Sequence, residues 1–262
     1  MPDIMEKEQP TRRKMVMFFL LDASNSMNEY GKIDSLNETM LDCIDYARDL
    51  DAKQSDVDIN IAVLSFGVGD NGTKCEWMCG EPEPVDRFVW KDIAASGWTP
   101  LASALDMLNS VMSRKKFLDT PSASYAPVIT VISDGIPIMP SEIGGGGYDD
   151  SQNVLEAIEK LKKNAWFNES IRVAISIGDD ANKPLLEKIT GSDKTVLECY
   201  SKERLNKIIE FIMLTSSMIS STIVKESNNA PFKPQERMEQ ELENNKELSE
   251  EELVGSSGWS TE

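Results

Sequence analysis

Seven consecutive apolar residues, Met15 to Leu21 (MVMFFLL), are followed at once by an acid and two hydroxyls at alternate positions: Asp22, Ser24 and Ser26. The apolar run is too short to cross a bilayer, for which a helix needs about 20 such residues. An unbroken apolar run of this length is typical of a strand buried on both faces of a sheet. Ligands of open α/β sheets bind outside the carboxyl ends of the strands. The stretch therefore predicts a central strand whose carboxyl end opens into a functional site.

The rest of the chain alternates between strand and helix patterns. Inner strands are predicted at residues 56–66, 126–133 and 171–177, a further strand at 196–199, and short edge strands or extended segments at 73–78 and 85–90. Helices are predicted at about 33–50, 101–117, 151–164, 183–189 and 202–219, with a long glycine-containing loop before the third. This order predicts a doubly wound α/β fold with a mostly parallel sheet and helices on both faces.

Composition divides the chain into three parts. Residues 1–13 are polar and are expected to be a flexible extension, whereas residues 14–223 carry the α/β pattern of a single domain. Residues 224–262 form an acidic tail, which from Pro231 onward holds nine acidic and three basic residues. A segment with so few apolar residues is expected to be disordered.

Charge and residue content exclude several functions. The formal net charge of −18 disfavours nucleic-acid binding, because a phosphate backbone is met by lysine and arginine. The chain contains no histidine, which removes Ser-His-Asp and Cys-His catalysis and every histidine-containing zinc site. No long apolar stretch or secretory signal is visible, so we expect a cytoplasmic protein that does not enter a membrane.

Three segments supply oxygen ligands near the expected carboxyl edge of the sheet. They are the Asp22/Ser24/Ser26 cluster, Thr99 in the loop before a helix, and Asp134 directly after the strand at 126–133. Two carboxylates and three hydroxyls, without nitrogen or sulfur, suit Mg²⁺, with Mn²⁺ or Ca²⁺ as further candidates. Local capping of a strand-to-helix turn is the simpler explanation for the first cluster alone.

The motifs DASNS, WTPLASAL and ITVISDGIP, in this order and spacing, resemble the von Willebrand factor type A (vWA) family. The resemblance implies a metal-ion-dependent adhesion site in which Ser24, Ser26 and Thr99 are direct ligands. Asp22 and Asp134 would then bind the metal directly or through water. An Asp or Glu of a partner protein would complete the coordination, so the implied function is binding and not catalysis.

Two further points follow from the resemblance. Many family members have glycine where this chain has Asn25, and asparagine tolerates a left-handed backbone better than other non-glycine residues. The stretches GWTPLASAL and SDGIP resemble the cytoplasmic bacterial tellurite-resistance and stress type. That type implies an adaptor with a kinase or phosphatase as its partner.

Two other functions remain open. One is a Mg²⁺-dependent phosphohydrolase with Asp22 as nucleophile, although Ser24 stands where a second carboxylate would be expected and no motif places a lysine. The other is a subunit of a metal-chelatase-like ATPase complex, whose P-loop would have to lie in another chain.

Several motifs have simpler explanations than a ligand site. Gly67-x-Gly69-x-x-Gly72 matches a dinucleotide fingerprint but is not followed by a helix, which favours a β-turn. Cys75 and Cys79 have no histidine to complete a metal set and are expected to be ordinary thiols. Asp149 and Asp150 could flank the metal but are expected to start a helix, where acidic residues suit the helix dipole. Trp98 either contacts a partner or packs under its loop, and the sequence favours neither.

Overall fold

The computed structural model of the chain describes residues 12–119, 123–141, 146–223, 233–249 and 259. Its centre is a 7-stranded sheet in the order β3-β2-β1-β5-β8-β9, with β4 paired to β2. The strands are β1 (Arg13–Asp22), β2 (Val57–Val68), β3 (Lys74–Trp77), β4 (Glu83–Pro84), β5 (Val128–Ser133), β8 (Ile171–Ile177) and β9 (Val196–Cys199). β1, β2, β5, β8 and β9 run parallel, and β3 and β4 are antiparallel to β2.

β1 lies in the middle of the sheet because both of its faces are apolar. Met17, Phe19 and Leu21 belong to one hydrophobic cluster, and the residues between them, such as Phe18 and Leu20, belong to the other. Successive side chains of a strand point to opposite faces, so an unbroken apolar run fills two cores at once. The predicted central strand is confirmed.

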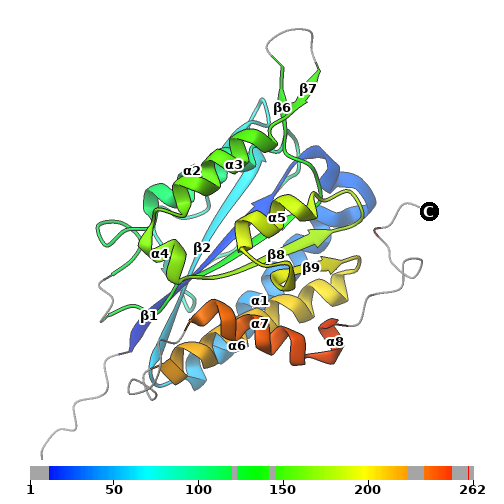
Figure 1. Cartoon of the computed structure of the whole chain (residues 1–262). Helices are drawn as coiled ribbons and strands as arrows, with labels where there is room; N and C mark the ends of the chain where they lie inside the picture. Colours follow the sequence, from blue (N-terminus) through cyan, green and yellow to red (C-terminus); the bar gives the residue numbers. More distant parts are fainter. Residues whose placement is uncertain (1–11, 120–122, 142–145, 224–232, 250–258, 260–262) are drawn as a thin grey trace, which may run out of the picture.

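Helices cover both faces of the sheet (Figure 1). One face packs against α1 (Lys32–Lys53) and α6 (Lys202–Ile223), and the other against α2 (Leu101–Val111), α3 (Ser151–Leu161) and α5 (Lys183–Thr190). Shorter helices lie between them: η1 (Asn25–Gly31), α4 (Ala165–Glu169) and η2 (Asp193–Thr195). The doubly wound, mostly parallel α/β fold is therefore confirmed.

Some local predictions differ from the structure. Where a long loop was expected, β6 (Ile138–Pro140) and β7 (Gly147–Asp149) form an antiparallel hairpin, which projects beyond the sheet in Figure 1. The expected extended segment at 85–90 is a turn, because the amides of Arg87 and Phe88 both donate to the carbonyl of Pro84. The helix predicted to reach Phe117 ends at Val111.

The acidic C-terminal region also differs from the expectation of disorder wherever the structure describes it. Residues 224–232, 250–258 and 260–262 lie outside the described part. Within the rest, α7 (Pro234–Asn244) and α8 (Lys246–Ser249) are helical. The side chains of Met238 and Leu242 are buried, at helical spacing, which the average composition of the tail conceals.

Gln235 of α7 joins this region to the sheet. β9 pairs β8 only from Ala174 onward, so Arg172 has no strand partner on that side. The backbone amide of Arg172 donates to Gln235 Oε1 at 2.7 Å, and Gln235 Nε2 donates to the carbonyl of Arg172 at 3.2 Å. A side-chain amide thus takes the place of a neighbouring peptide group.

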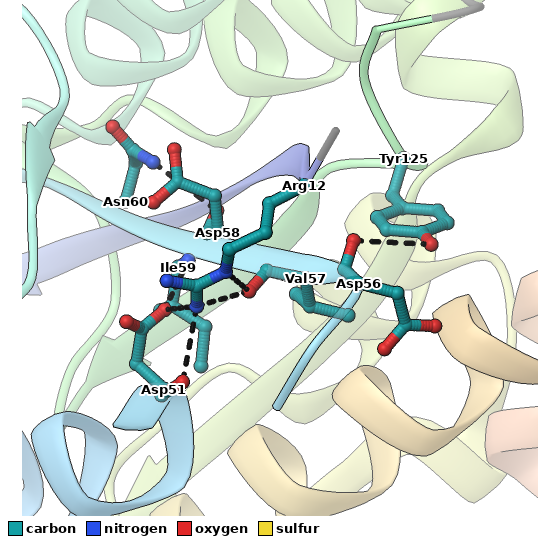
Figure 2. Close-up of polar contacts among 8 residues, drawn as sticks. All are labelled: Arg12, Asp51, Asp56, Val57, Asp58, Ile59, Asn60 and Tyr125. Atoms are coloured by element: carbon teal, nitrogen blue, oxygen red, sulfur yellow. Dashed lines mark hydrogen bonds and ion pairs between the residues drawn. The ribbon is translucent and has the colours of Figure 1, made fainter. Parts of the chain in front are cut away.

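The amino end of the sheet is held by an arginine and an aspartate (Figure 2). Arg12 Nη2 lies 2.7 Å from Asp51 Oδ1, and Arg12 Nε donates to the carbonyl of Val57 at 2.8 Å. The same Asp51 oxygen accepts the amide of Ile59 at 2.8 Å. Residues 1–11 of the expected flexible extension lie outside the described residues, whereas Arg13 already belongs to β1.

In the described part of the chain, no helix is both long and apolar enough to span a membrane.

Candidate metal centre

Asp22 and Asp134 lie at the carboxyl ends of two neighbouring parallel strands. Asp22 is the last residue of β1, and Asp134 follows directly after Ser133, the last residue of β5. From β1 the chain goes first to β2 on one side of the sheet and later to β5 on the other. This point, where the strand order reverses, is where doubly wound folds bind their ligands.

A chain of hydrogen bonds connects four of the five predicted ligands. The amide of Ser24 donates to Asp22 Oδ1 at 2.8 Å, and the hydroxyls of Ser24 and Ser26 lie 3.1 Å apart. The Ser26 hydroxyl donates to Asp134 Oδ1 at 2.7 Å. The residues that the sequence separates by more than one hundred positions are therefore brought into one polar cluster.

Thr99 lies in the loop that runs beside this cluster. The amide of Asn25 donates to the carbonyl of Gly97 at 2.8 Å, and the amide of Ser96 donates to the carbonyl of Ala23 at 3.0 Å. The Thr99 side chain is buried. No hydrogen bond joins it to the other four predicted ligands within the described residues. Its position rests on the backbone pairing of the two loops and on its own amide, which donates to the carbonyl of Ile138 at 2.9 Å.

Gly67 at the end of β2 allows these two loops to approach each other. Its φ of +90° is in the region that favours glycine, and a Cβ built on it would lie 2.6 Å from the carbonyl oxygen of Trp98 and 2.8 Å from the amide nitrogen of Ser24. Any side chain would therefore collide with backbone of both loops.

The backbone of Asn25 is not left-handed, so the tolerance of asparagine for that conformation is not needed here. Tyr30, with φ of 54°, is the one non-glycine residue with a positive φ in the described part of the chain. Asn25 instead opens the 3-10 helix η1, a conformation that asparagine adopts without strain. The replacement of glycine at this motif position therefore leaves the loop intact.

The surroundings of Asp22 disfavour the ionised form of its carboxyl group. Its side chain is fully buried, and this burial, together with the charge of Asp134, raises its pKa from 3.8 to about 7. Hydrogen bonds from Ser133 and Ser24 oppose the shift in part. A divalent cation beside Asp22 would stabilise its ionised form and so oppose both causes of the raised pKa, which means that the donor set fits a metal ion.

The donor set is composed of hard oxygens. The described residues contain no group of three or more His, Cys, Asp or Glu that could hold a metal. An ion held by the five predicted ligands would meet two carboxylates and three hydroxyls, with water in the remaining positions, which is the chemistry of Mg²⁺ or Mn²⁺.

Sequence reasoning missed two residues of the site. The Ser133 hydroxyl donates to Asp22 Oδ2 at 2.6 Å, and Lys32 Nζ lies 2.8 Å from Asp134 Oδ2. The sequence contains a feature that could have pointed to each of them. Ser133 is a hydroxyl residue at the end of an apolar strand, and Lys32 is a cation one residue before the apolar face of a helix begins at Ile33.

The remaining motifs have structural roles. Gly69 and Gly72 form the turn between the antiparallel strands β2 and β3, as predicted. Cys75 and Cys79 are free thiols, whose pKa values are raised by burial to about 12 and about 11, so both are protonated at neutral pH.

The structure confirms the expected helix start at Asp149 and shows where the ring of Trp98 packs. Asp149 Oδ1 accepts the amide of Ser151 at 2.8 Å at the start of α3, so it belongs to a helix start and not to the metal cluster. The ring of Trp98 lies against the β6–β7 hairpin, since a Cβ on Gly147 would lie 2.5 Å from its Cζ3 atom.

Comparison with known proteins supports the fold. No protein-family model matches the sequence, and neither does any curated protein. The vWF domain of the type V pili tip protein Mfa5 from Porphyromonas gingivalis superposes with a TM-score of 0.54 at 10% identity, over 80% of this chain and 97% of that chain. The pilus adhesin SpaC from Lactobacillus rhamnosus GG gives 0.52 at 13% identity, over 80% of this chain and 30% of that one.

A third solved structure is proximal thread matrix protein 1 from the mussel byssus with a zinc-occupied MIDAS motif, at a TM-score of 0.47 and 15% identity, over 80% of this chain and 47% of that one. The chain thus spans less than half of the length of SpaC and of the mussel protein. The shared architecture is a vWA-like α/β fold.

Proposed function

We propose that the chain is a non-enzymatic module that binds a partner protein through a divalent metal ion. Asp22, Ser24, Ser26, Thr99 and Asp134 would hold the ion, and an Asp or Glu of the partner would complete its coordination. The observation that carries the proposal is the continuous hydrogen-bonded cluster from Asp22 to Asp134, in which the Asp22 carboxylate is fully buried. The fold shared with a pilus adhesin supports a binding role.

A melting experiment tests the metal part of this proposal. An ion that binds the native state stabilises it by about 2.7 kcal/mol when its concentration is 100 times Kd. Mg²⁺ or Mn²⁺ should therefore raise Tm relative to EDTA, and Asp22→Ala should abolish the shift. Asp86→Ala is the matched control, because Asp86 is exposed and remote from the cluster. A Tm that is the same with EDTA and with either ion would refute an ion site.

The phosphohydrolase remains the second candidate, because Lys32 now supplies the cation that the sequence motifs did not place. Two observations weigh against it. Both oxygens of Asp22 accept hydrogen bonds, from the Ser24 amide and the Ser133 hydroxyl, and its side chain is fully buried. Turnover of a generic aryl phosphate that is lost in Asp22→Asn would establish the enzyme instead.

For the cellular role we propose a cytoplasmic adaptor in a bacterial stress or tellurite-resistance assembly with a protein kinase or phosphatase. The support is the likeness of GWTPLASAL and SDGIP to that type of vWA protein. A subunit of a chelatase-like ATPase complex is the alternative assembly. Affinity capture from native lysate with Mg²⁺ and with EDTA distinguishes them by whether the Mg²⁺-dependent partner is a kinase or phosphatase, or a P-loop ATPase.

A further inference from the structure

Lys32 is a cation enclosed within the candidate metal centre. Its side chain is 4% exposed and that of Asp134 is 0% exposed, and the two form an ion pair of 2.8 Å. Asp134 is the one acidic partner that Lys32 has among the described residues. Asp134 therefore divides its two oxygens between a serine hydroxyl of the metal motif, that of Ser26, and an ammonium group.

The surroundings of Lys32 leave its side chain little freedom to leave this position. A Cβ built on Gly178, directly after β8, would lie 3.7 Å from both Cε and Nζ of Lys32. The same position is 3.1 Å from the carbonyl oxygen of Trp259, whose side chain is buried. The residue that follows β8 therefore lies close to the end of the lysine side chain, and the backbone of Trp259 lies beside that same residue.

The charges at the site give this arrangement a consequence for ion binding. With both aspartates ionised and Lys32 protonated, the formal charge is −1, so a divalent ion leaves the site at +1. Without Lys32 the same ion would leave it neutral. Like charges in a buried site repel strongly, and an excess positive charge attracts an incoming carboxylate.

We propose that Lys32 is an internal cation that lowers the affinity of the unpartnered site for a divalent ion and makes ion binding depend on a carboxylate from the partner. This inference rests on the proposed function, because it concerns the same site. The partner acid and the ion then bind cooperatively, each raising the affinity of the other by the same factor.

A purely structural role for Lys32 predicts the opposite result. If the ammonium only holds Asp134 in place, its removal would displace a ligand and weaken ion binding. If it repels the ion, its removal would strengthen ion binding and abolish the benefit of an added carboxylate. The direction of the change therefore separates the two roles.

Mn²⁺ titration followed by the electron paramagnetic resonance signal of free Mn²⁺ provides the test, with sodium acetate as the carboxylate and equimolar sodium chloride as its control. Acetate should tighten Mn²⁺ binding to the wild-type chain by about fivefold or more, within the usual range of coupling. Lys32→Met should bind Mn²⁺ about tenfold more tightly than wild type in chloride and gain nothing from acetate. Lys32→Arg keeps the positive charge and should retain the acetate effect, whereas Lys207→Met, which removes an exposed lysine of α6, should behave as wild type.

Two outcomes would overturn the proposal in different ways. Weaker Mn²⁺ binding by Lys32→Met, with the acetate effect retained, would show that Lys32 only anchors Asp134 and would leave the proposed function in place. Absence of Mn²⁺ binding in every variant, with and without acetate, would overturn both. Circular dichroism checks whether Lys32→Met keeps the wild-type fold. If this variant does not fold, Lys32→Gln is used in its place.

Discussion

The hydroxyl of Ser133 donates a hydrogen bond of 2.6 Å to Oδ2 of Asp22, across the boundary between β5 and β1. Both residues are fully or almost fully buried. A hydrogen bond to a charged group contributes about 1.5–3 kcal/mol, more than one between neutral groups. Ser133 is therefore a main support of the Asp22 carboxylate, although it is not one of the five predicted metal ligands.

Ser133→Ala should lower the free energy of unfolding by about 1.5–3 kcal/mol at pH 8 in EDTA, because Asp22 then loses a donor in a buried site. Urea denaturation measures the change. Ser110→Ala is the control, since Ser110 bonds to Met107 at an exposed position of α2, and it should stay within about 0.5 kcal/mol of wild type. Equal effects of the two substitutions would mean that Asp22 does not depend on Ser133.

The raised pKa of Asp22 predicts how stability depends on pH. Since the pKa rises from 3.8 in the unfolded chain to about 7 in the native chain, the native state binds more protons between these values. The Asp22 contribution to stability in EDTA should thus fall as pH rises from about 4 to about 7, by at most about 1.4 kcal/mol per pH unit, and then stay constant.

Asp22→Asn isolates this contribution from that of other groups. Relative to wild type, the variant should gain stability between pH 4 and pH 7, as measured by urea denaturation in EDTA. Metal affinity of the wild-type chain should rise over the same range, because the ion competes with the proton. A difference between the two chains that does not change with pH would contradict the raised pKa.

Gly67→Ala should destabilise the chain by about 2 to 3 kcal/mol, because the new methyl group meets the backbone of two loops and the residue must keep a positive φ. Metal binding should weaken at the same time, since these loops carry Ser24 and Thr99. Gly80→Ala is the matched control: a Cβ there has no atom within 4 Å, and the substitution should leave Tm unchanged. Thermal melting with and without Mn²⁺ measures both effects.

Met238→Ala should lower the free energy of unfolding by about 2 to 5 kcal/mol, as for other buried methionines, because Met238 of α7 is fully buried in the core. Gln240→Ala, at an exposed position of the same helix, should be neutral. A neutral Met238→Ala in urea denaturation would mean that α7 is detached from the domain in solution.

The fold and most of the candidate site could be predicted from the sequence because their signals are local. Each inner strand is an apolar run, and each ligand follows a strand or opens a helix, so the parallel arrangement brings them to one edge. Asp22, Ser24, Ser26 and Asp134 meet in the structure for this reason.

What could not be predicted depends on contacts between distant segments. In the sequence, Lys32 looks like an ordinary residue at the start of a helix. Its role becomes visible only in the fold, where the end of β5 brings Asp134 beside it. The helix α7 has too little apolar content to be recognised alone, and it becomes ordered by burying Met238 and Leu242 against the domain. The hairpin β6–β7 has no alternating pattern and is positioned by Trp98 from another loop.

The pairing of Gln235 with the backbone of Arg172 bears on how the chain behaves in concentrated solution. A sheet edge with unpaired amides and carbonyls is a template on which a second molecule can add a strand, which is how many folded proteins begin to aggregate. Gln235 occupies both groups of Arg172 at the one stretch of β8 that β9 leaves uncovered. We therefore expect Gln235 to hinder strand addition at this stretch of β8, and Gln235→Ala should reduce solubility before it reduces stability.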